Sequence, residues 1–420
     1  MEKFIILGGR RLSGKVRAST SKNATLPIMA ASLLSEEPTI IKNAPKLTDV
    51  ETMMEMLTAL GVKVKKEGKN LYIDPSGRLN PEAPYEIVKR MRASYYVLGS
   101  LLGRMRRAKV AFPGGCAIGP RPIDLHLKGM EKLDAKVKIE HGFIIAEASS
   151  LKGAEMTLEG PSGSSVGATC NVMLAATLAK GRTVIRCAAC EPEVVDLASF
   201  LNKMGAKIRG AGTPVITIDG VKRLKGVEYK PIPDRIETAT LLVAGVITRG
   251  EVEVTHCIPE HLRSVLEKLE EAGAEIELSK NSIRVRISER PKSLRITTAP
   301  YPGFPTDMQA QFMALLSLAS NTSIITETIF EARFLHALEL GRMGADITLE
   351  ANRAIIKGVE KLTGAPVMAS DLRASAALVL AGLAAEGRTD VSRIYHLDRG
   401  YEHLEKKLNS LGASIRREEE

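Results

Sequence analysis

The chain has 420 residues, of which 44% are hydrophobic and 26% are charged, the composition of an ordinary globular protein with room for two or three domains. No apolar run approaches the roughly 18 residues that span a bilayer, and the short apolar start does not resemble a secretion signal, so we expect a cytoplasmic protein without membrane contact. The net charge of +10 suggests a nucleic-acid partner, but aromatic residues are only 4% and basic residues are interspersed with acidic ones, which favours a basic cleft for a small polyanion.

One supersecondary unit is repeated six times along the chain. Each copy ends a helix in a turn of the Gly-Ala type and continues into a short strand, and this turn recurs about every 70 residues. The six copies are Leu60–Val64, Leu133–Val137, Met204–Ile208, Ala272–Ile276, Met343–Ile347 and Leu411–Ile415. Since a regular repeat indicates one folding unit copied several times, chemistry is expected where the copies differ.

Within each unit the pattern predicts the order β-α-β-α-β-β. The first, apolar helix opens on polar residues typical of helix N-termini, as at Lys22–Leu26 in the first unit and Asp371–Ser375 in the last. A strand such as Lys109–Phe112 follows. The second helix is amphipathic, as in residues 50–60, where Met and Leu side chains share one face.

The two ends of the chain indicate how the units group into domains. The last copy stops before its two closing strands, and Gly8–Gly14 at the start parallels Gly220–Gly226 and Gly358–Gly364. Residues 1–21 are therefore expected to complete the sixth unit. Three units per domain predict one domain at 22–231 and a second at 1–21 plus 232–420. Because the chain would cross twice between them, ligands are expected in the cleft.

Several helix starts carry a charged side chain. The unpaired N–H groups and the helix dipole make such a start an anion site worth about 0.3–1 kcal/mol when exposed. The charged residues are Lys22, Arg92, Asp307 and Arg373. If the domains face each other, these starts would converge on one site suited to phosphates; the alternative is that each residue only caps its helix.

The second unit departs from the repeat in a long loop of Gly and Pro residues around Cys116. Glycine supplies the hinge freedom that a closing lid requires. An unpaired cysteine is usually a small buried hydrophobe, but Arg121 follows Cys116 closely, and a cationic neighbour favours thiolate chemistry. We therefore expect a lid at about residues 112–122 with a reactive cysteine.

A series of motifs, in order over essentially the whole length, supports a more specific interpretation. They are Ser21–Ala24, Met91–Ser94, Pro113–Cys116, Asp124–His126, Ser165–Thr169, Phe304–Gln311, Asp371–Ala374 and Asp398–Tyr401. These motifs resemble the UDP-N-acetylglucosamine 1-carboxyvinyltransferase family of the EPSP synthase superfamily. The resemblance implies a two-domain inside-out α/β barrel of six βαβαββ units. It also implies the first committed step of peptidoglycan synthesis, in which the enolpyruvyl group of phosphoenolpyruvate passes to the 3′-hydroxyl of UDP-N-acetylglucosamine and phosphate is released.

The same resemblance implies the catalytic residues. Cys116 matches the lid cysteine that protonates the enol methylene and that the antibiotic fosfomycin alkylates, and Asp307 matches the group that takes the sugar hydroxyl proton. Lys22, Arg121 and Arg399 match the cations that hold phosphoenolpyruvate. Addition followed by elimination uses an acid and a base on opposite sides of the reacting carbon and no metal or other cofactor. A helix start at Asp307 would keep its carboxylate ionised.

The sugar-nucleotide site also follows from the resemblance. Its expected residues are Asn23, Arg92, Arg121, Pro122, Ile123, Asp124, Leu125, Ser165, Val166, Gly167 and Ile329, and Asp371 and Arg373 are expected to support the cleft. One departure concerns Gly163, which stands where some family members carry Lys or Phe. The contact that this side chain makes with the nucleotide elsewhere has no counterpart at Gly163.

Other interpretations are weaker. The sister transferase for shikimate 3-phosphate shares the fold and phosphoenolpyruvate but lacks the cysteine lid motif. A basic protein of repeated units could bind RNA, but RNA binding would need stacking aromatic residues, and the chain has only eight Phe and eight Tyr. Cys187 and Cys190 have a metal or redox spacing without a second pair. We therefore expect phosphoenolpyruvate and UDP-N-acetylglucosamine as partners of a monomer or weak homo-oligomer.

Overall fold

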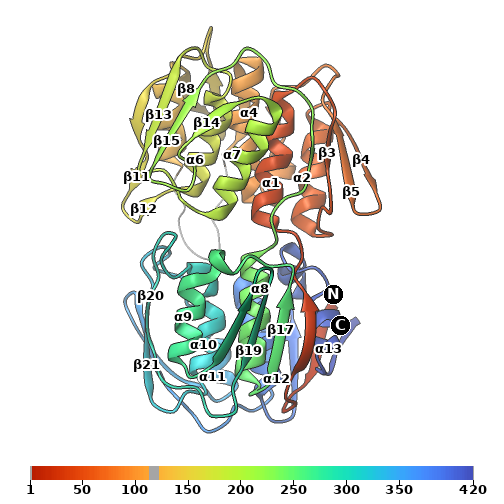
Figure 1. The fold of residues 1–420 in the computed structure, drawn as a ribbon, viewed down its shortest axis with the longest axis vertical. Helices are drawn as coiled ribbons and strands as arrows, with labels where there is room; N and C mark the ends of the chain where they lie inside the picture. Colours follow the sequence, from red (N-terminus) through yellow and green to blue (C-terminus); the bar gives the residue numbers. More distant parts are fainter. Residues whose placement is uncertain (1, 113–122, 420) are drawn as a thin grey trace. The chain divides into compact units, whose positions relative to one another are not determined.

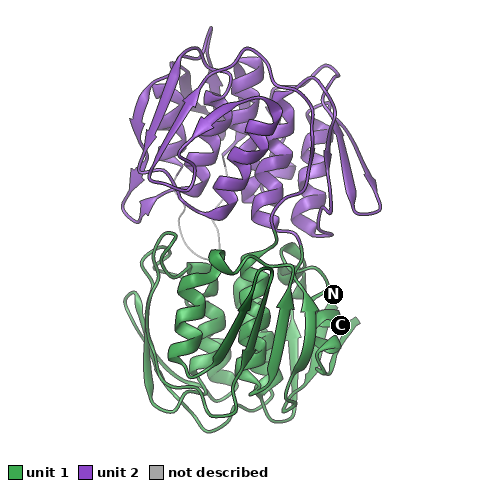
Figure 2. Cartoon of the chain, viewed as in Figure 1, with its two compact units in different colours: residues 1–19, 116–120, 233–420 green, residues 20–115, 121–232 purple. Residues whose placement is uncertain are grey.

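The structure is a computed structural model that describes residues 2–112 and 123–419. The chain divides into two compact units, coloured separately in Figure 2. Among the described residues, unit 1 holds 2–19 and 233–419, and unit 2 holds 20–112 and 123–232. Most of the loop expected to form a lid, including Cys116 and Arg121, lies outside the described residues.

Sheets of one strand order recur throughout the described part of the chain. Each unit there contains three four-stranded sheets, in which a strand from the neighbouring repeat lies parallel to the first strand and the remaining two are antiparallel. In unit 2 these sheets are β16 (Glu228–Tyr229), β3 (Thr39–Ile41), β5 (Asn70–Asp74) and β4 (Lys63–Glu67); β6 (Glu82–Ala83), β7 (Arg107–Ala111), β9 (Phe143–Glu147) and β8 (Lys136–Glu140); and β10 (Glu155–Thr157), β13 (Arg182–Arg186), β15 (Val215–Asp219) and β14 (Lys207–Arg209). A small hairpin of β11 (Glu159–Gly160) and β12 (Gly163–Ser164) is added in this unit.

Unit 1 follows the same plan. Its sheets are β2 (Ser13–Arg17), β17 (Glu251–Thr255), β19 (Ser282–Arg286) and β18 (Glu275–Ser279); β20 (Arg295–Thr297), β21 (Thr322–Thr326), β23 (Arg353–Lys357) and β22 (Asp346–Glu350); and β24 (Pro366–Met368), β25 (Arg388–Ser392), β1 (Glu2–Leu7) and β26 (Ile415–Glu419). The first strand of the chain is thus an inner strand of the last sheet. It pairs with β25 on one side and β26 on the other, and its Phe4 and Ile6 side chains are buried.

Three apolar helices form the core of each unit, and the sheets lie outside them (Figure 1). The core helices are α1 (Lys22–Ala31), α4 (Tyr96–Met105) and α6 (Val166–Ala176) in unit 2, and α8 (Arg235–Ile247), α10 (Gln309–Leu316) and α12 (Leu372–Ala384) in unit 1. They are buried on all sides; every residue from Ile236 to Ile247 of α8 is buried. Helices inside and sheets outside are the predicted inside-out arrangement, and the βαβαββ repeat is confirmed.

The second helix of each unit is buried on one face only. These helices are α2 (Thr48–Ala59), α5 (Asp124–Lys132), α7 (Pro192–Met204), α9 (Arg263–Glu271), α11 (Leu335–Arg342) and α13 (Leu404–Ser410). The repeated turn that follows each of them places one residue in the left-handed region, which explains the recurring glycine; Gly205 has φ 108°, and in the second unit Asp134 takes the position with φ 72°. In the described part of the chain, no helix is long and apolar enough to cross a membrane.

Candidate active site

In unit 2, the start of α1 presents a lysine that is already paired. Ser21 caps the helix by accepting a hydrogen bond from the Ala24 amide at 3.2 Å. Lys22 Nζ lies 3.0 Å from Asp49 Oδ2, and the two side chains are 12% and 4% exposed. Asp49 comes from the first turn of α2, so sequence spacing gave no sign of this pair. The pair fixes an ammonium group at a helix start, where the positive end of the helix dipole lies, an arrangement that suits an anion.

Six of the eight described residues that are expected to bind the sugar nucleotide in unit 2 lie on two segments that contact each other. Ile123 is buried at the start of α5, Asp124 is exposed, and Leu125 is half-buried. Ser165 caps α6 by accepting from the Ala168 amide, and Val166 and Gly167 are half-buried. The remaining two, Asn23 on α1 and Arg92 in the turn before α4, are also half-buried.

His126 joins these two segments. A Cβ atom on Gly167 would lie 2.9 Å from its Cε1 and Nε2 atoms, so any larger residue there would force the imidazole to shift. The Nδ1 atom of His126 lies 2.9 Å from Asn171 Nδ2, and Asn171 Oδ1 accepts from the Gly99 amide at 2.8 Å. Because the Asn171 amide nitrogen donates, Nδ1 accepts and the imidazole is neutral. Burial, assisted by the charge of Arg92, lowers the pKa of His126 to about 3.

In unit 1, Asp307 lies in the single turn Thr306–Met308 that precedes α10. Arg333 Nη1 donates to its Oδ1 and Arg373 Nη2 to its Oδ2, both at 2.9 Å. The two arginine side chains are 6% and 4% exposed, whereas Asp307 is 28% exposed and remains accessible. Burial alone would raise the pKa of Asp307, but attraction and hydrogen bonds from Arg373 and Arg333 lower it well below its usual range. The carboxylate is therefore ionised because of two arginines, and not only because of the helix start that the sequence suggested.

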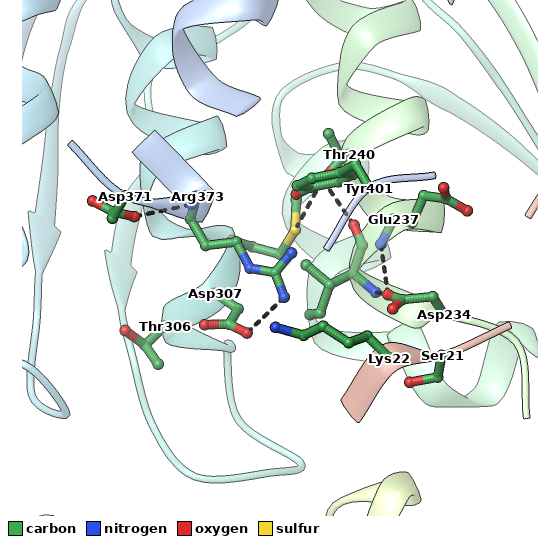
Figure 3. Close-up of polar contacts among 12 residues, drawn as sticks. Ser21, Lys22, Asp234, Glu237, Thr240, Thr306, Asp307, Asp371, Arg373 and Tyr401 are labelled. Carbon is green, nitrogen blue, oxygen red and sulfur yellow. Dashed lines mark hydrogen bonds and ion pairs between the residues drawn. The ribbon is translucent and has the colours of Figure 1, made fainter. Parts of the chain in front are cut away.

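Arg373 is itself held on several sides, as Figure 3 shows. Asp371 caps α12 by accepting from the amides of Arg373 and Ala374 at 2.9 and 3.1 Å. The guanidinium carbon lies 5.4 Å from the centre of the Tyr401 ring. The Tyr401 hydroxyl lies 3.0 Å from Thr240 Oγ1 and accepts from Gln311 Nε2 at 3.2 Å. Asp307, Asp371 and Arg373 thus form one connected set within unit 1.

The two other residues expected in the site of unit 1, Arg399 and Ile329, lie on other segments of the chain. Arg399 is half-buried in the turn Ile394–Arg399, and Ile329 is half-buried just after β21. Sequence reasoning missed Arg333, because an arginine in a loop before α11 is normally expected on the surface. Cys116, Arg121 and Pro122 lie outside the described residues.

Comparisons with known proteins agree over the full length. The family described as EPSP synthase (3-phosphoshikimate 1-carboxyvinyltransferase) matches residues 6–408. A UDP-N-acetylglucosamine 1-carboxyvinyltransferase of Desulfosudis oleivorans is 55% identical over 417 residues, 99% of both chains, and one of Myxococcus xanthus is 53% identical over 421 residues, 100% of both. Among solved structures, the enolpyruvyl transferase NikO from Streptomyces tendae matches with a TM-score of 0.88 at 26% identity over 99% of this chain and 98% of that one. An EPSP synthase from Acinetobacter baumannii matches with 0.74 at 17% identity over 100% of both chains, which supports the fold.

Proposed function

This chain belongs to the EPSP synthase family and is a transferase, and we propose that it transfers the enolpyruvyl group of phosphoenolpyruvate to the 3′-hydroxyl of UDP-N-acetylglucosamine with release of phosphate. The assignment rests on two relatives that are named for this activity and are identical to this chain at more than half of the aligned positions over nearly their full lengths. The shikimate 3-phosphate alternative is not favoured, since the solved EPSP synthase shares only 17% identity. The product would enter peptidoglycan synthesis and so serve the cell wall, cell shape and cell division.

The observation that best supports the chemistry is the ionised, accessible carboxylate of Asp307. In the addition step a proton is delivered to C3 of phosphoenolpyruvate, and the sugar oxygen bonds to the electrophilic C2 while its proton passes to Asp307. In the elimination step the C2–O bond to phosphate breaks and C3 loses a proton, leaving the enolpyruvyl ether. We assign the proton donor to Cys116 from the sequence alone.

Phosphoenolpyruvate is a compact polyanion that a few cations can hold. We propose that Lys22 and Arg399, together with Arg121, bind its phosphate and carboxylate through charge-assisted hydrogen bonds worth about 1.5–3 kcal/mol each. Sugar-nucleotide binding is assigned to the segments that His126 joins, with Asn23 and Arg92, and to Ile329 in unit 1. We further propose a cytoplasmic enzyme that acts as a monomer or weak homo-oligomer.

Phosphate release tests this function directly. The enzyme is incubated with phosphoenolpyruvate alone, with UDP-N-acetylglucosamine added, or with shikimate 3-phosphate added. We expect phosphate release only with the sugar nucleotide. Phosphate release that requires shikimate 3-phosphate and not the sugar nucleotide would assign the sister activity. If neither acceptor led to phosphate release from phosphoenolpyruvate, both activities would be rejected.

Variants of Cys116 test the proton donor. Cys116→Ala should abolish or sharply slow turnover, because no acid then delivers the proton to C3. Cys116→Asp should retain activity, since a carboxylic acid can donate a proton, but should resist fosfomycin because the alkylated sulfur is gone. Full activity of the alanine variant would exclude the role of Cys116 as proton donor.

A further inference from the structure

A buried carboxylate lies behind Asp307 in unit 1. Glu327, at the end of β21, has no exposed surface. Its Oε1 atom accepts from Thr298 Oγ1 at 2.7 Å and from the backbone amides of Ile329 and Phe330 at 2.8 and 3.1 Å. Its Oε2 atom accepts from Thr306 Oγ1 at 2.9 Å. Burying a carboxylate is costly unless donors surround it, and these four donors offset that cost.

The Thr306 hydroxyl connects this carboxylate to the reactive one. Arg333 Nη1 donates to Thr306 Oγ1 at 3.0 Å and also to Asp307 Oδ1 at 2.9 Å. A hydroxyl has one hydrogen, and here it points at Glu327, so a lone pair of the same oxygen remains for Arg333. The direction of every bond from Glu327 through Thr306 and Arg333 to Asp307 is therefore determined.

The network has a geometric consequence for Asp307. The Nη1 atom of Arg333 has two hydrogens, and Thr306 and Asp307 receive one each. The Thr306 bond thus restricts how the guanidinium group can rotate and directs the second hydrogen of Nη1 toward Asp307 Oδ1. Through the Ile329 amide, Glu327 also anchors the segment assigned to the sugar nucleotide.

We propose that Thr306 is a positioning residue, which uses the buried Glu327 as its anchor to orient Arg333 and, through it, the carboxylate of Asp307 toward the acceptor hydroxyl. This inference rests on the proposed function and deepens it. The hydroxyl of Thr306 is occupied by Glu327 and Arg333, so the proposal gives it no proton transfer to substrate. Its loss should therefore lower the rate of the chemical step more than it weakens substrate binding.

A matched pair of variants in the full-length enzyme tests the proposal. Thr306→Val keeps the shape of the side chain but lacks the hydroxyl, whereas Thr306→Ser keeps the hydroxyl. We expect Thr306→Val to lower kcat about tenfold or more, with KM for phosphoenolpyruvate changed less than about threefold, and Thr306→Ser to restore most of the rate. Equal kcat values for the two folded variants would overturn the proposal.

A second readout does not depend on turnover. Weaker contact between Arg333 and Asp307 in Thr306→Val should raise the pKa of Asp307 toward its usual range, so acid unfolding should begin at a higher pH than in Thr306→Ser. If the acid unfolding curves of Thr306→Val and Thr306→Ser coincided, the proposal would be overturned, whichever substrate accepts the enolpyruvyl group. Absence of phosphate release by the unmodified enzyme would instead reject the proposed function, and the acid unfolding comparison would still decide the role of Thr306.

Discussion

The Asp307 carboxylate is accessible and has a fixed orientation. The two arginines that fix its orientation also make it a weak base. Arg333 and Arg373 hold one oxygen each, so the carboxylate cannot rotate, yet its pKa lies well below the usual range. A weak base accepts a hydroxyl proton only as the hydroxyl becomes acidic, which happens while its oxygen bonds to C2. In the role that we propose for Asp307, this arrangement favours proton transfer together with C–O bond formation over prior deprotonation of the sugar.

His126 makes stability depend on pH. The pKa of His126 is about 3 in the folded protein, against an ordinary value of 6.5, because burial disfavours the imidazolium. Between these values the unfolded chain binds a proton that the folded protein does not, so stability falls on acidification, by about 1.4 kcal/mol per pH unit. From pH 7 to 5, this histidine alone should remove about 2 kcal/mol, and His336, with a pKa of about 4, acts in the same direction.

Urea unfolding at the two pH values measures this contribution. His126→Gln should be less stable at pH 7 because its bond to Asn171 changes, but it should lose about 2 kcal/mol less than the unmodified protein on going to pH 5. His141→Gln, which alters an exposed histidine of the same unit, is the control and should keep the original pH dependence. An unchanged pH dependence in His126→Gln would show that this imidazole is not buried in its neutral form.

At the scale of elements, the sequence pattern predicted where helices and strands begin, but it predicted few of the contacts between them. The helix starts at Lys22, Ser165 and Asp371 were readable because capping and apolar patterns are local. The partners of the charged groups could not be predicted, because Asp49 reaches Lys22 from another helix and Arg333 reaches Asp307 from a loop. Local patterns predict an element, whereas the distance between two side chains depends on how elements pack.

The crossing of α4 and α6 depends on a glycine that the pattern did not single out. A Cβ atom on Gly99 would lie 2.3 Å from the carbonyl oxygen of Asn171 and 2.8 Å from its Oδ1. We expect Gly99→Ala to separate the helices and to cost about 1–3 kcal/mol, despite the better helix propensity of alanine. The bond from Asn171 to His126 should be disturbed as well, so the KM for UDP-N-acetylglucosamine should rise.

Gly341 in α11 is the matched control, since a Cβ atom there meets no atom within 4 Å. Gly341→Ala should stabilise the protein by about 0.5–1 kcal/mol. The two variants are compared by the midpoint of urea unfolding and should shift it in opposite directions. A Gly99→Ala protein as stable as the original would mean that the two helices tolerate a wider separation.

At the scale of the whole molecule, each unit closes its own ring of three sheets. In unit 2 the ring closes within one stretch of chain, because β16 pairs with β3. In unit 1 it closes only through the N-terminus, because β2 pairs with β17, and β1 pairs with β25 and β26. The chain thus returns to unit 1 after building unit 2, and residues 2–19 are as much a part of its core as any later strand.

This topology predicts that unit 1 folds from a rearranged chain. Glu2 and Glu419 are direct partners in the antiparallel pair of β1 and β26, so a two-residue Asn-Gly turn can connect residue 419 to residue 2. We expect residues 233–419, followed by this turn and residues 2–19, to unfold cooperatively on heating, as followed by circular dichroism. The same fragment without residues 2–19 should not, because it lacks an inner strand and the buried Phe4 and Ile6 side chains. Equal cooperativity of the two fragments would mean that the three repeats of unit 1 form their core without β1, and that its inner position in the sheet contributes little to stability.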